Sequence, residues 1–165
     1  MPEFDALSTA RFYLRLACHV AKLDSHDPHT HNGAVLVNEN GLFVAAANQF
    51  PVGVIRDGAR LERPTKYSYI EHAERNVIYM AAQQGFVTKR ATLYCPWFAC
   101  ADCARAIICA GITKVVGLAH PPAHGSWQES CDRGDEMFRE AGVEFYRLEE
   151  KLGTFVLRDG KQVEV

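Results

Sequence analysis

The stretches His-Ala-Glu at residues 72–74 and Cys-Ala-Asp-Cys at residues 100–103 each open a predicted helix, and a predicted strand at 91–95 lies between them. Two cysteines three positions apart on the first turn of a helix project from the same face, so both sulfurs can reach one metal ion. The histidine would supply a third ligand and leave the fourth position of a tetrahedral zinc site to water. Three protein ligands and a water are the catalytic arrangement of zinc. The two stretches therefore predict a catalytic zinc site.

Glu74 is the candidate for the proton-transfer group of this site. It lies two residues after His72, at the same predicted helix start, where partial positive charge and free N–H groups favour thiolates and hydroxide. We expect its carboxylate not to bind the metal but to take a proton from the metal-bound water and pass it on. One histidine, two cysteines and a non-ligand glutamate are the signature of zinc-dependent deaminases of nucleobases.

The same residues also have simpler structural interpretations. The two cysteines could pack as small buried hydrophobic residues, and His72 and Glu74 could be a core histidine and a surface charge. Zinc could also be purely structural, with Cys95 on the preceding strand as the best candidate for a fourth ligand. The combination of the two motifs favours the catalytic interpretation. The remaining cysteines, interpreted as core or inert thiols, are Cys18, Cys109 and Cys131.

The hydrophobic pattern predicts one domain over residues 1–165, with its core at 8–148. The tail at 149–165 has the pattern of a short hairpin, and Asn-Gly at 40–41 predicts a tight turn between two strands. The order of elements predicts an α/β fold of three layers, α/β/α, with a mixed central sheet of about five strands and helices on both faces. Helices are predicted at 8–23, 71–84, 101–110 and 129–141, strands at 33–37, 42–47, 91–95, 113–119 and 143–148, and a polar loop at 51–64.

Composition and charge limit the classes of partner. The chain has 165 residues with 18 basic and 20 acidic side chains, a net charge of −2. Without a basic excess we expect no nucleic-acid polymer as partner, whereas a small nucleotide needs only one or two local cations. No apolar run is long enough to span a bilayer and the N-terminal residues do not resemble a secretory signal, so we expect no membrane and a cytoplasmic location. Six cysteines in a reducing compartment favour thiols or metal ligands over disulfides.

Three more stretches carry a resemblance to a known family. They are Asp-Pro-His-Thr at 27–30 before Gly-Ala-Val at 33–35, Asn-Gln-Phe-Pro-Val-Gly at 48–53, and Lys-Tyr-Ser-Tyr-Ile-Glu-His-Ala-Glu-Arg-Asn at 66–76. With the zinc motif, the chain resembles the cytidine deaminase superfamily over roughly residues 27–146, and most closely its deoxycytidylate (dCMP) deaminase branch. The chain departs from that branch at three positions, two of them near the expected nucleotide pocket. These are Ala99 in place of proline, Glu71 in place of cysteine and Gln49 in place of glycine.

The resemblance implies a cytidine-deaminase-like fold, a Zn2+ cofactor and a homo-oligomer, dimer or hexamer. It implies that the Asn48 side chain binds the sugar and that the backbone at Ala73 reads the pyrimidine edge. Lys66 and Tyr69, in the same matching stretch, are also expected to bind substrate. For the metal site it implies the ligands His72, Cys100 and Cys103, with Glu74 as the proton shuttle.

We therefore expect a hydrolase that converts dCMP to dUMP and ammonia, in which zinc-bound hydroxide attacks C-4 and Glu74 transfers the protons. One alternative is the same chemistry on cytosine, a cytidine nucleoside, guanine or another purine, because pocket loops set the substrate. An alternative of another class is a non-catalytic, zinc-stabilised nucleotide-binding module. Glu74 argues against that module, since a structural site needs no carboxylate beside an open position.

Arg56, Arg60, Arg63 and Lys66 form a small cationic group ahead of His72. Two interpretations stay open, a solvated loop or a phosphate clamp that would distinguish a nucleotide from a nucleoside.

Other aromatic and imidazole side chains lie in predicted loops or at a helix end. His120 and His124 follow a strand at the sheet edge where ligands bind in open sheets. Trp127 either stacks on a substrate ring or anchors its loop. Four further histidines favour surface or turn roles over a second, structural metal site: His19, His26, His29 and His31.

Overall fold

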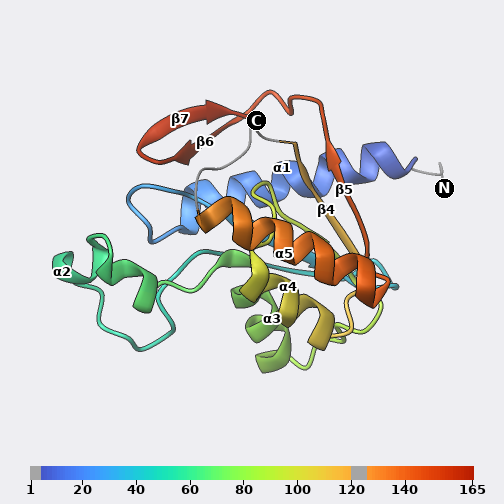
Figure 1. Ribbon diagram of the computed structural model, residues 1–165, viewed down its shortest axis with the longest axis horizontal. Helices are drawn as coiled ribbons and strands as arrows, with labels where there is room; N and C mark the ends of the chain where they lie inside the picture. The colour runs from blue at the N-terminus through green and yellow to red at the C-terminus, as the bar shows by residue number, and fades with distance from the viewer. Residues whose placement is uncertain (1–4, 120–125) are drawn as a thin grey trace.

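The computed structural model describes residues 5–119 and 126–165, and its centre is a five-stranded sheet in the order β2-β1-β3-β4-β5 (Figure 1). β1 is antiparallel to both β2 and β3, whereas β3, β4 and β5 run parallel to one another. The predicted mixed sheet of five strands is therefore confirmed. The strands are β1 (Gly33–Val37), β2 (Phe43–Ala47), β3 (Thr92–Tyr94), β4 (Lys114–Leu118) and β5 (Glu144–Leu148).

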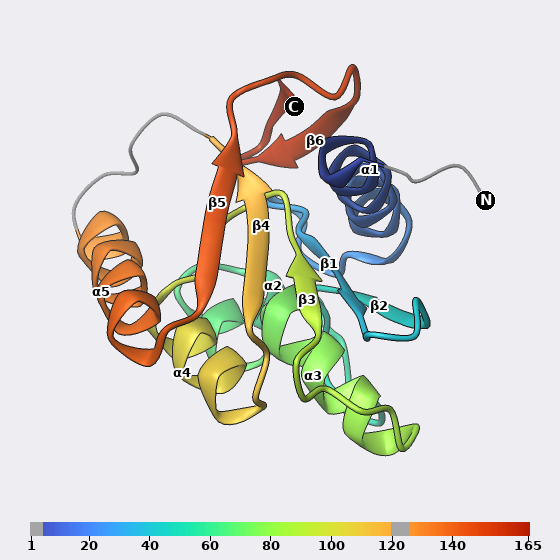
Figure 2. The ribbon, with the colours of Figure 1, turned by 90° about the vertical axis from the view of Figure 1, so that its right-hand side faces the viewer.

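Helices cover both faces of this sheet, which confirms the three predicted layers (Figure 2). α1 (Ala6–Asp24) covers one face, beside a hairpin of β6 (Phe155–Arg158) and β7 (Lys161–Glu164). The other face is covered by three helices that pack against one core, and the zinc motif lies at the start of two of them. The three helices are α3 (Ala73–Gln83), α4 (Ala101–Cys109) and α5 (Ser126–Ala141). Among the described residues, no helix combines the length and the apolar character that crossing a membrane requires.

Each strand supplies both cores because successive side chains point to opposite faces of a sheet. In β1, Leu36 packs beneath α3 and α4, whereas its neighbour Val35 packs beneath α1. In β4, Val115 likewise packs on the face covered by α3 and α4, and Val116 packs on the face covered by α1. Strands buried on both faces read as continuous apolar runs, which is how these segments were recognised in the sequence.

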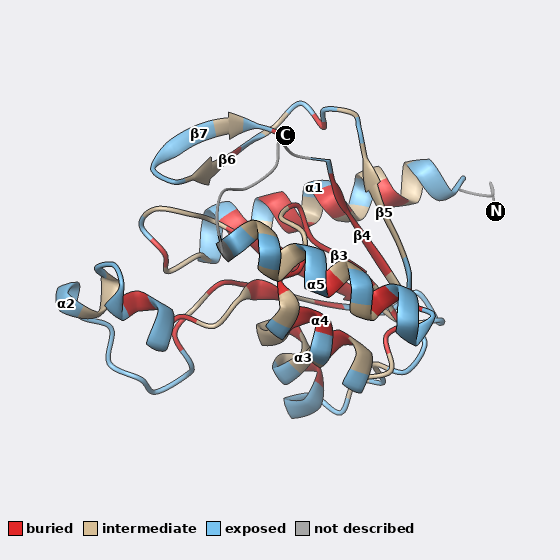
Figure 3. Cartoon of the chain, in the orientation of Figure 1, coloured by how far each residue is buried: buried red, intermediate tan, exposed pale blue. Residues whose placement is uncertain are grey.

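The helix predicted at residues 8–23 is present as α1, but the large apolar residues that mark it in the sequence do not form its buried face. The spacing of Phe12, Leu16, Val20 and Leu23 predicted the helix, yet Phe12 is 58% exposed and Leu23 is 69% exposed. The buried residues of α1, red in Figure 3, are instead mostly small, which lets the helix approach the sheet closely. These residues are Ala10, Leu14, Ala17, Cys18 and Ala21.

Gly33 shows how close that approach is. A Cβ atom at this position would lie 2.1 Å from the backbone oxygen of Ala17. We expect Gly33→Ala to lower the free energy of unfolding by about 3 kcal/mol, because α1 would have to move off β1. Urea unfolding measures this. Gly58→Ala is the matched control, since a Cβ there meets nothing within 4 Å, and it should change stability by less than about 1 kcal/mol. Equal stability of the two variants would contradict the close packing.

Two segments differ from the predictions by more than two residues. The segment predicted as a loop contains a short helix, α2 (Gly58–Leu61), at the end of an arm that extends from the body (Figure 1). Its first turn is capped by the Asp57 carboxylate, which accepts from the backbone N–H of Arg60 at 3.0 Å. α5 begins three residues earlier than predicted, so Trp127 lies on a helix rather than in a loop.

Candidate active site

Two helix starts bring three metal-binding side chains together. His72 is the N-cap of α3 and Cys100 is the N-cap of α4, both with extended backbone, and Cys103 follows in the first turn of α4. His72 Nδ1 lies 3.6 Å from Cys100 Sγ and 3.4 Å from Cys103 Sγ, and the two sulfurs are 3.6 Å apart. Within residues 5–119 and 126–165 this is the one group of histidine, cysteine or acidic side chains close enough to share an ion.

These distances fit zinc. Bond lengths of about 2.3 Å to sulfur and 2.0–2.1 Å to nitrogen in a tetrahedral site place sulfur and nitrogen about 3.5 Å apart and two sulfurs about 3.8 Å apart. The observed separations agree within a few tenths of an ångström. Because Cys95 is not part of the group, the described residues supply three ligands, which is the open, catalytic number.

The surroundings favour the thiolate at Cys100, whereas the hydrogen bond with Cys100 and burial raise the pKa of the Cys103 thiol. Hydrogen bonds with Cys103 and with His72 lower the pKa of the Cys100 thiol to about 4. Both cysteines lie at the N-terminus of α4, where the helix dipole favours negative charge. Arg75 reaches across from α3, with its guanidinium Nη1 3.5 Å from Asp102 Oδ2. The Arg75 guanidinium and the N-terminus of α4 thus place positive charge near the sulfurs.

Glu74 is buried beside the three ligands. It is 2% exposed, and burial raises the pKa of its carboxyl to about 7. Its Oε2 accepts a hydrogen bond from Asn32 Nδ2 at 3.1 Å. A carboxyl group with a pKa near neutrality can both take and release a proton at physiological pH, which is what a proton shuttle needs.

The part of the chain that holds this site is similar to a known protein family. A model of the cytidine and deoxycytidylate deaminase zinc-binding region matches residues 7–119. The chain belongs to this deaminase family. It is therefore a hydrolase that acts on C–N bonds, and Zn2+ is its cofactor.

Relatives match most of the chain. The deoxycytidylate deaminase of Mus musculus is 31% identical over 160 residues, which cover 93% of this chain and 86% of the mouse protein. An uncharacterized deaminase encoded 3′ of luxG in Aliivibrio fischeri is 34% identical over 121 residues, or 73% of this chain and 80% of that protein. The solved structure of the cyanophage S-TIM5 dCMP deaminase with dCMP and dUMP has a TM-score of 0.68 at 22% identity, over 90% of this chain and 98% of that one. The last likeness shows that the fold is shared.

Asn48, predicted to bind the sugar, lies at the end of β2 and is 7% exposed. Its Oδ1 accepts from Ser25 Oγ at 2.7 Å and from the backbone N–H of Asn32 at 2.9 Å, while its Nδ2 donates to Thr30 O at 2.8 Å. In this deaminase the side chain therefore shapes the loop that precedes β1. It reaches Glu74 indirectly, because Asn32 contacts both residues.

Lys66, also predicted to bind substrate, forms a buried ion pair. Its side chain is 2% exposed, and its Nζ lies 2.6 Å from Asp27 Oδ2. The same Asp27 carboxylate accepts from the backbone N–H groups of His29 and Thr30. Lys66 thereby ties the segment before α3 to the loop before β1. Asp27 was quoted in a family motif but was not recognised as the partner, because 39 residues separate the two.

Removing Lys66 tests whether it stabilises the fold or binds phosphate. We expect Lys66→Met to lower the free energy of unfolding by about 3–5 kcal/mol, because Asp27 would keep a buried, unpaired charge. Urea unfolding checks this. Arg63→Met, which breaks an exposed ion pair with Asp159, is the control and should cost less than about 1 kcal/mol. Unchanged stability with a raised KM for a nucleotide but not for its nucleoside would identify Lys66 as a phosphate ligand instead.

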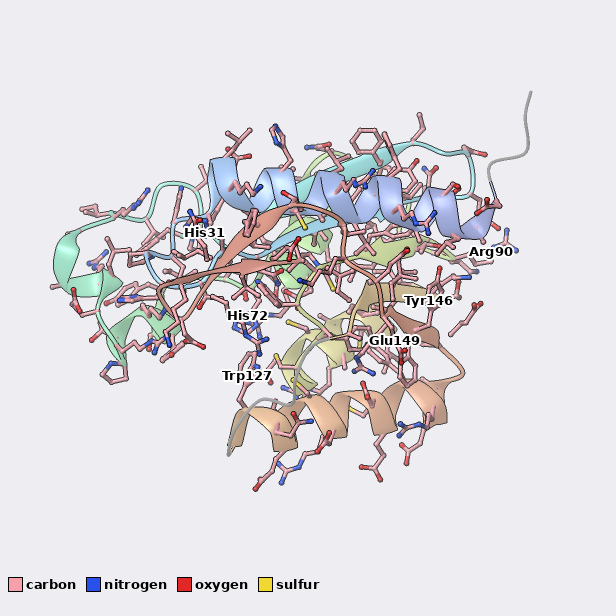
Figure 4. The ribbon with its side chains drawn as sticks, turned by 90° about the horizontal axis from the view of Figure 1, so that it is seen from above. His31, His72, Arg90, Trp127, Tyr146 and Glu149 are labelled. Atoms are coloured by element: carbon pink, nitrogen blue, oxygen red, sulfur yellow. The ribbon has the colours of Figure 1, made fainter. Side chains whose placement is uncertain are left out.

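Trp127 lies against a metal ligand. Its ring centroid is 5.7 Å from that of His72, and Figure 4 shows it reaching from α5 toward the imidazole. It is nevertheless 45% exposed, so part of its ring remains open to solvent. His120 and His124, named with it in the sequence, lie outside the described residues.

The other predicted substrate residues lie around the same helix start. Ala73 is fully buried as the first residue of α3. Tyr69 stacks on Phe50, with ring centroids 6.2 Å apart, and the Arg60 guanidinium lies 4.6 Å above its ring. Of the histidines near the N-terminus, none belongs to the group that could bind a metal among the described residues.

Two of the departures from the family pattern face one another. Gln49 and Glu71 form an antiparallel bridge through both backbone N–H groups. The Gln49 side chain accepts from Asn76, and the Glu71 carboxylate accepts from the backbone N–H of His72 and pairs with Arg75. The hydrogen bonds of these two residues thus stabilise the segment that leads into α3. The third departure, Ala99, is fully buried beside α5, where its backbone oxygen lies close to Gly134.

Proposed function

We propose that this deaminase converts dCMP to dUMP with release of ammonia. The observation that carries the proposal is a buried, non-ligand carboxylate, Glu74, beside a group of three zinc-binding side chains. The choice of dCMP is supported by similarity to deoxycytidylate deaminases over 93% of the chain. A carboxylate in this position has no use in a structural zinc site, which argues against a binding module without activity.

The reaction replaces the amine at C-4 of the pyrimidine by oxygen from water. When bound, zinc lowers the pKa of a coordinated water to about 7. As the water oxygen attacks C-4, Glu74 takes one proton from that water. Glu74 then donates this proton to the ring nitrogen N-3. Glu74 then takes the remaining hydroxyl proton and delivers it to the amine, which leaves as ammonia. The two protons of water thus end on N-3 and on the ammonia.

For substrate binding we propose that the backbone at Ala73 reads the pyrimidine edge and that Tyr69 lines the pocket. The exposed part of the Trp127 ring is suited to stack on the base, because it lies beside His72. Asn48 and Lys66 contribute by holding the loop before β1, and a direct contact of Asn48 with the sugar stays a proposal.

Phosphate recognition is proposed for the arm around α2. Arg60 and Arg63 already contact Asp57 and Asp159, whereas Arg56 is exposed and pairs with no carboxylate within the described residues. An exposed guanidinium can bind phosphate through two parallel hydrogen bonds. Exposed apolar side chains on the same arm and on β2 are consistent with the predicted homo-oligomer, which light scattering after gel filtration tests. They include Val52, Ile55 and Phe43.

The experiment is ammonia release from a panel of dCMP, dCTP, deoxycytidine, cytosine, CMP, guanine and AMP, with metal content determined on the same preparation. A strong preference for dCMP with about one zinc per chain supports the proposal. Turnover of only a free base or a purine keeps the chemistry and overturns the substrate. No ammonia from any compound, with zinc bound, overturns the deaminase proposal.

A further inference from the structure

Asn32, one residue before β1, contacts the proposed proton shuttle directly. It is 8% exposed and Glu74 is 2% exposed, so their hydrogen bond of 3.1 Å is buried. Within the described part of the chain, Asn32 is the side chain that donates to this carboxylate. Hydrogen bonds to a charged, buried group are among the stronger ones in proteins, and removing the donor leaves the charge without compensation.

The orientation of the Asn32 amide follows from its other contact. Asn32 Oδ1 accepts from the backbone N–H of Gly33 at 3.0 Å, so the oxygen faces the backbone and the NH2 group faces Glu74. An amide NH2 group can only donate. Glu74 Oε2 therefore accepts this hydrogen bond whether or not the carboxyl group is protonated. Among the described residues no side chain donates to Oε1, so Oε1 is the oxygen available to carry a proton.

The backbone of Asn32 is held from two sides. Asn32 exchanges two hydrogen bonds with Asn48, through its N–H to Oδ1 at 2.9 Å and through its carbonyl to the Asn48 N–H at 3.1 Å. Its neighbour His31 donates to Leu157 O in β6 at 2.8 Å and accepts from Trp97 Nε1 at 2.7 Å. The donor is thus fixed before any substrate binds, which is the condition for preorganised catalysis.

We propose that Asn32 is a positioning residue. It holds the Glu74 carboxylate so that one oxygen, Oε1, carries every transferred proton. Each proton that leaves the water moves to Oε1 and from Oε1 to the substrate, while Oε2 keeps its hydrogen bond from Asn32 throughout. Without that hydrogen bond the carboxylate can rotate, and the fraction of time in which a protonatable oxygen faces the substrate falls. This inference rests on the proposed function, because it assigns a role within the same reaction.

Two variants without the donor test the role in turnover. Asn32→Leu and Asn32→Asp both keep roughly the shape of asparagine. In the zinc-loaded enzyme we expect kcat to fall about 10- to 100-fold, with KM within about threefold and zinc retained. Asn76→Leu is the matched control, because Asn76 is an asparagine of α3 that donates to Ala47 O and to Gln49 but not to Glu74. It should lose stability yet keep kcat within about threefold. Unchanged kcat in both Asn32 variants would overturn the proposal.

A stability cycle tests the contact without any turnover. Asn32→Leu and Glu74→Leu each leave one buried polar partner unsatisfied, whereas the double variant removes both. We expect the zinc-loaded double variant to melt about 4 °C or more above the less stable single variant. Additive losses would show that the two side chains are not coupled, and would overturn the proposal even if deamination is confirmed. Coupling without deamination of any compound would instead count against the proposed function alone.

Discussion

Glu74→Gln is expected to leave the protein folded and loaded with zinc while lowering kcat for deamination by about 100- to 10,000-fold. Glutamine has the shape of glutamate, and its side-chain oxygen can still accept the hydrogen bond from Asn32, so the buried site keeps its packing. What it cannot do is accept a proton from water at neutral pH. Ammonia release and metal analysis on one preparation measure both halves of this prediction.

The control for that variant is Asp102→Asn. Asp102 lies between the two zinc cysteines in sequence, and its side chain is 56% exposed. Amidation removes a carboxylate from the same region without touching the buried one, so kcat should stay within about threefold. If Glu74→Gln kept the parent's turnover, the glutamate would have no part in proton transfer, and the mechanism proposed above would be wrong.

Cys103→Ser is expected to abolish zinc binding and, with it, detectable deamination. Serine has nearly the size of cysteine, but its hydroxyl is not deprotonated at neutral pH and binds zinc poorly. The remaining pair, His72 and Cys100, would bind the metal far more weakly. We expect less than about a tenth of an equivalent of zinc after dialysis and a lower melting temperature, because bound metal stabilises the folded state.

Two other cysteines provide the controls for the metal site. Cys109→Ser changes an exposed thiol of the same helix, α4, and should keep both zinc and activity. Cys95→Ser changes a buried thiol that lies outside the group of three. It should lose some stability but keep about one zinc per chain. Loss of zinc from Cys95→Ser would mean that the site is closed by four protein ligands, and therefore structural.

The fold was predictable where the signal is local. Strands at residues 33–37 and 42–47 were recognised because they are apolar runs joined by an Asn-Gly turn, and α3 and α4 because glycines end them at residues 85 and 111. At α1 the pattern predicted the helix but not its buried face, since two of the large apolar residues that mark it, Phe12 and Leu23, are exposed. Close packing against Gly33 demands small side chains, and a pattern of hydrophobicity does not contain that steric requirement.

The candidate site was also predictable from local signals and not from contacts between residues far apart in the sequence. By itself, the sequence grouped Cys100 with Cys103, because the first turn of a helix places these side chains within a few ångströms of one another, and it added His72 through the combined motif and the family resemblance. Only the tertiary structure decided which partners meet the buried charges. Lys66 pairs with Asp27 across 39 residues, and Glu74 accepts from Asn32 across 42. A buried charge must have a partner, but the folded path of the chain selects which residue it is.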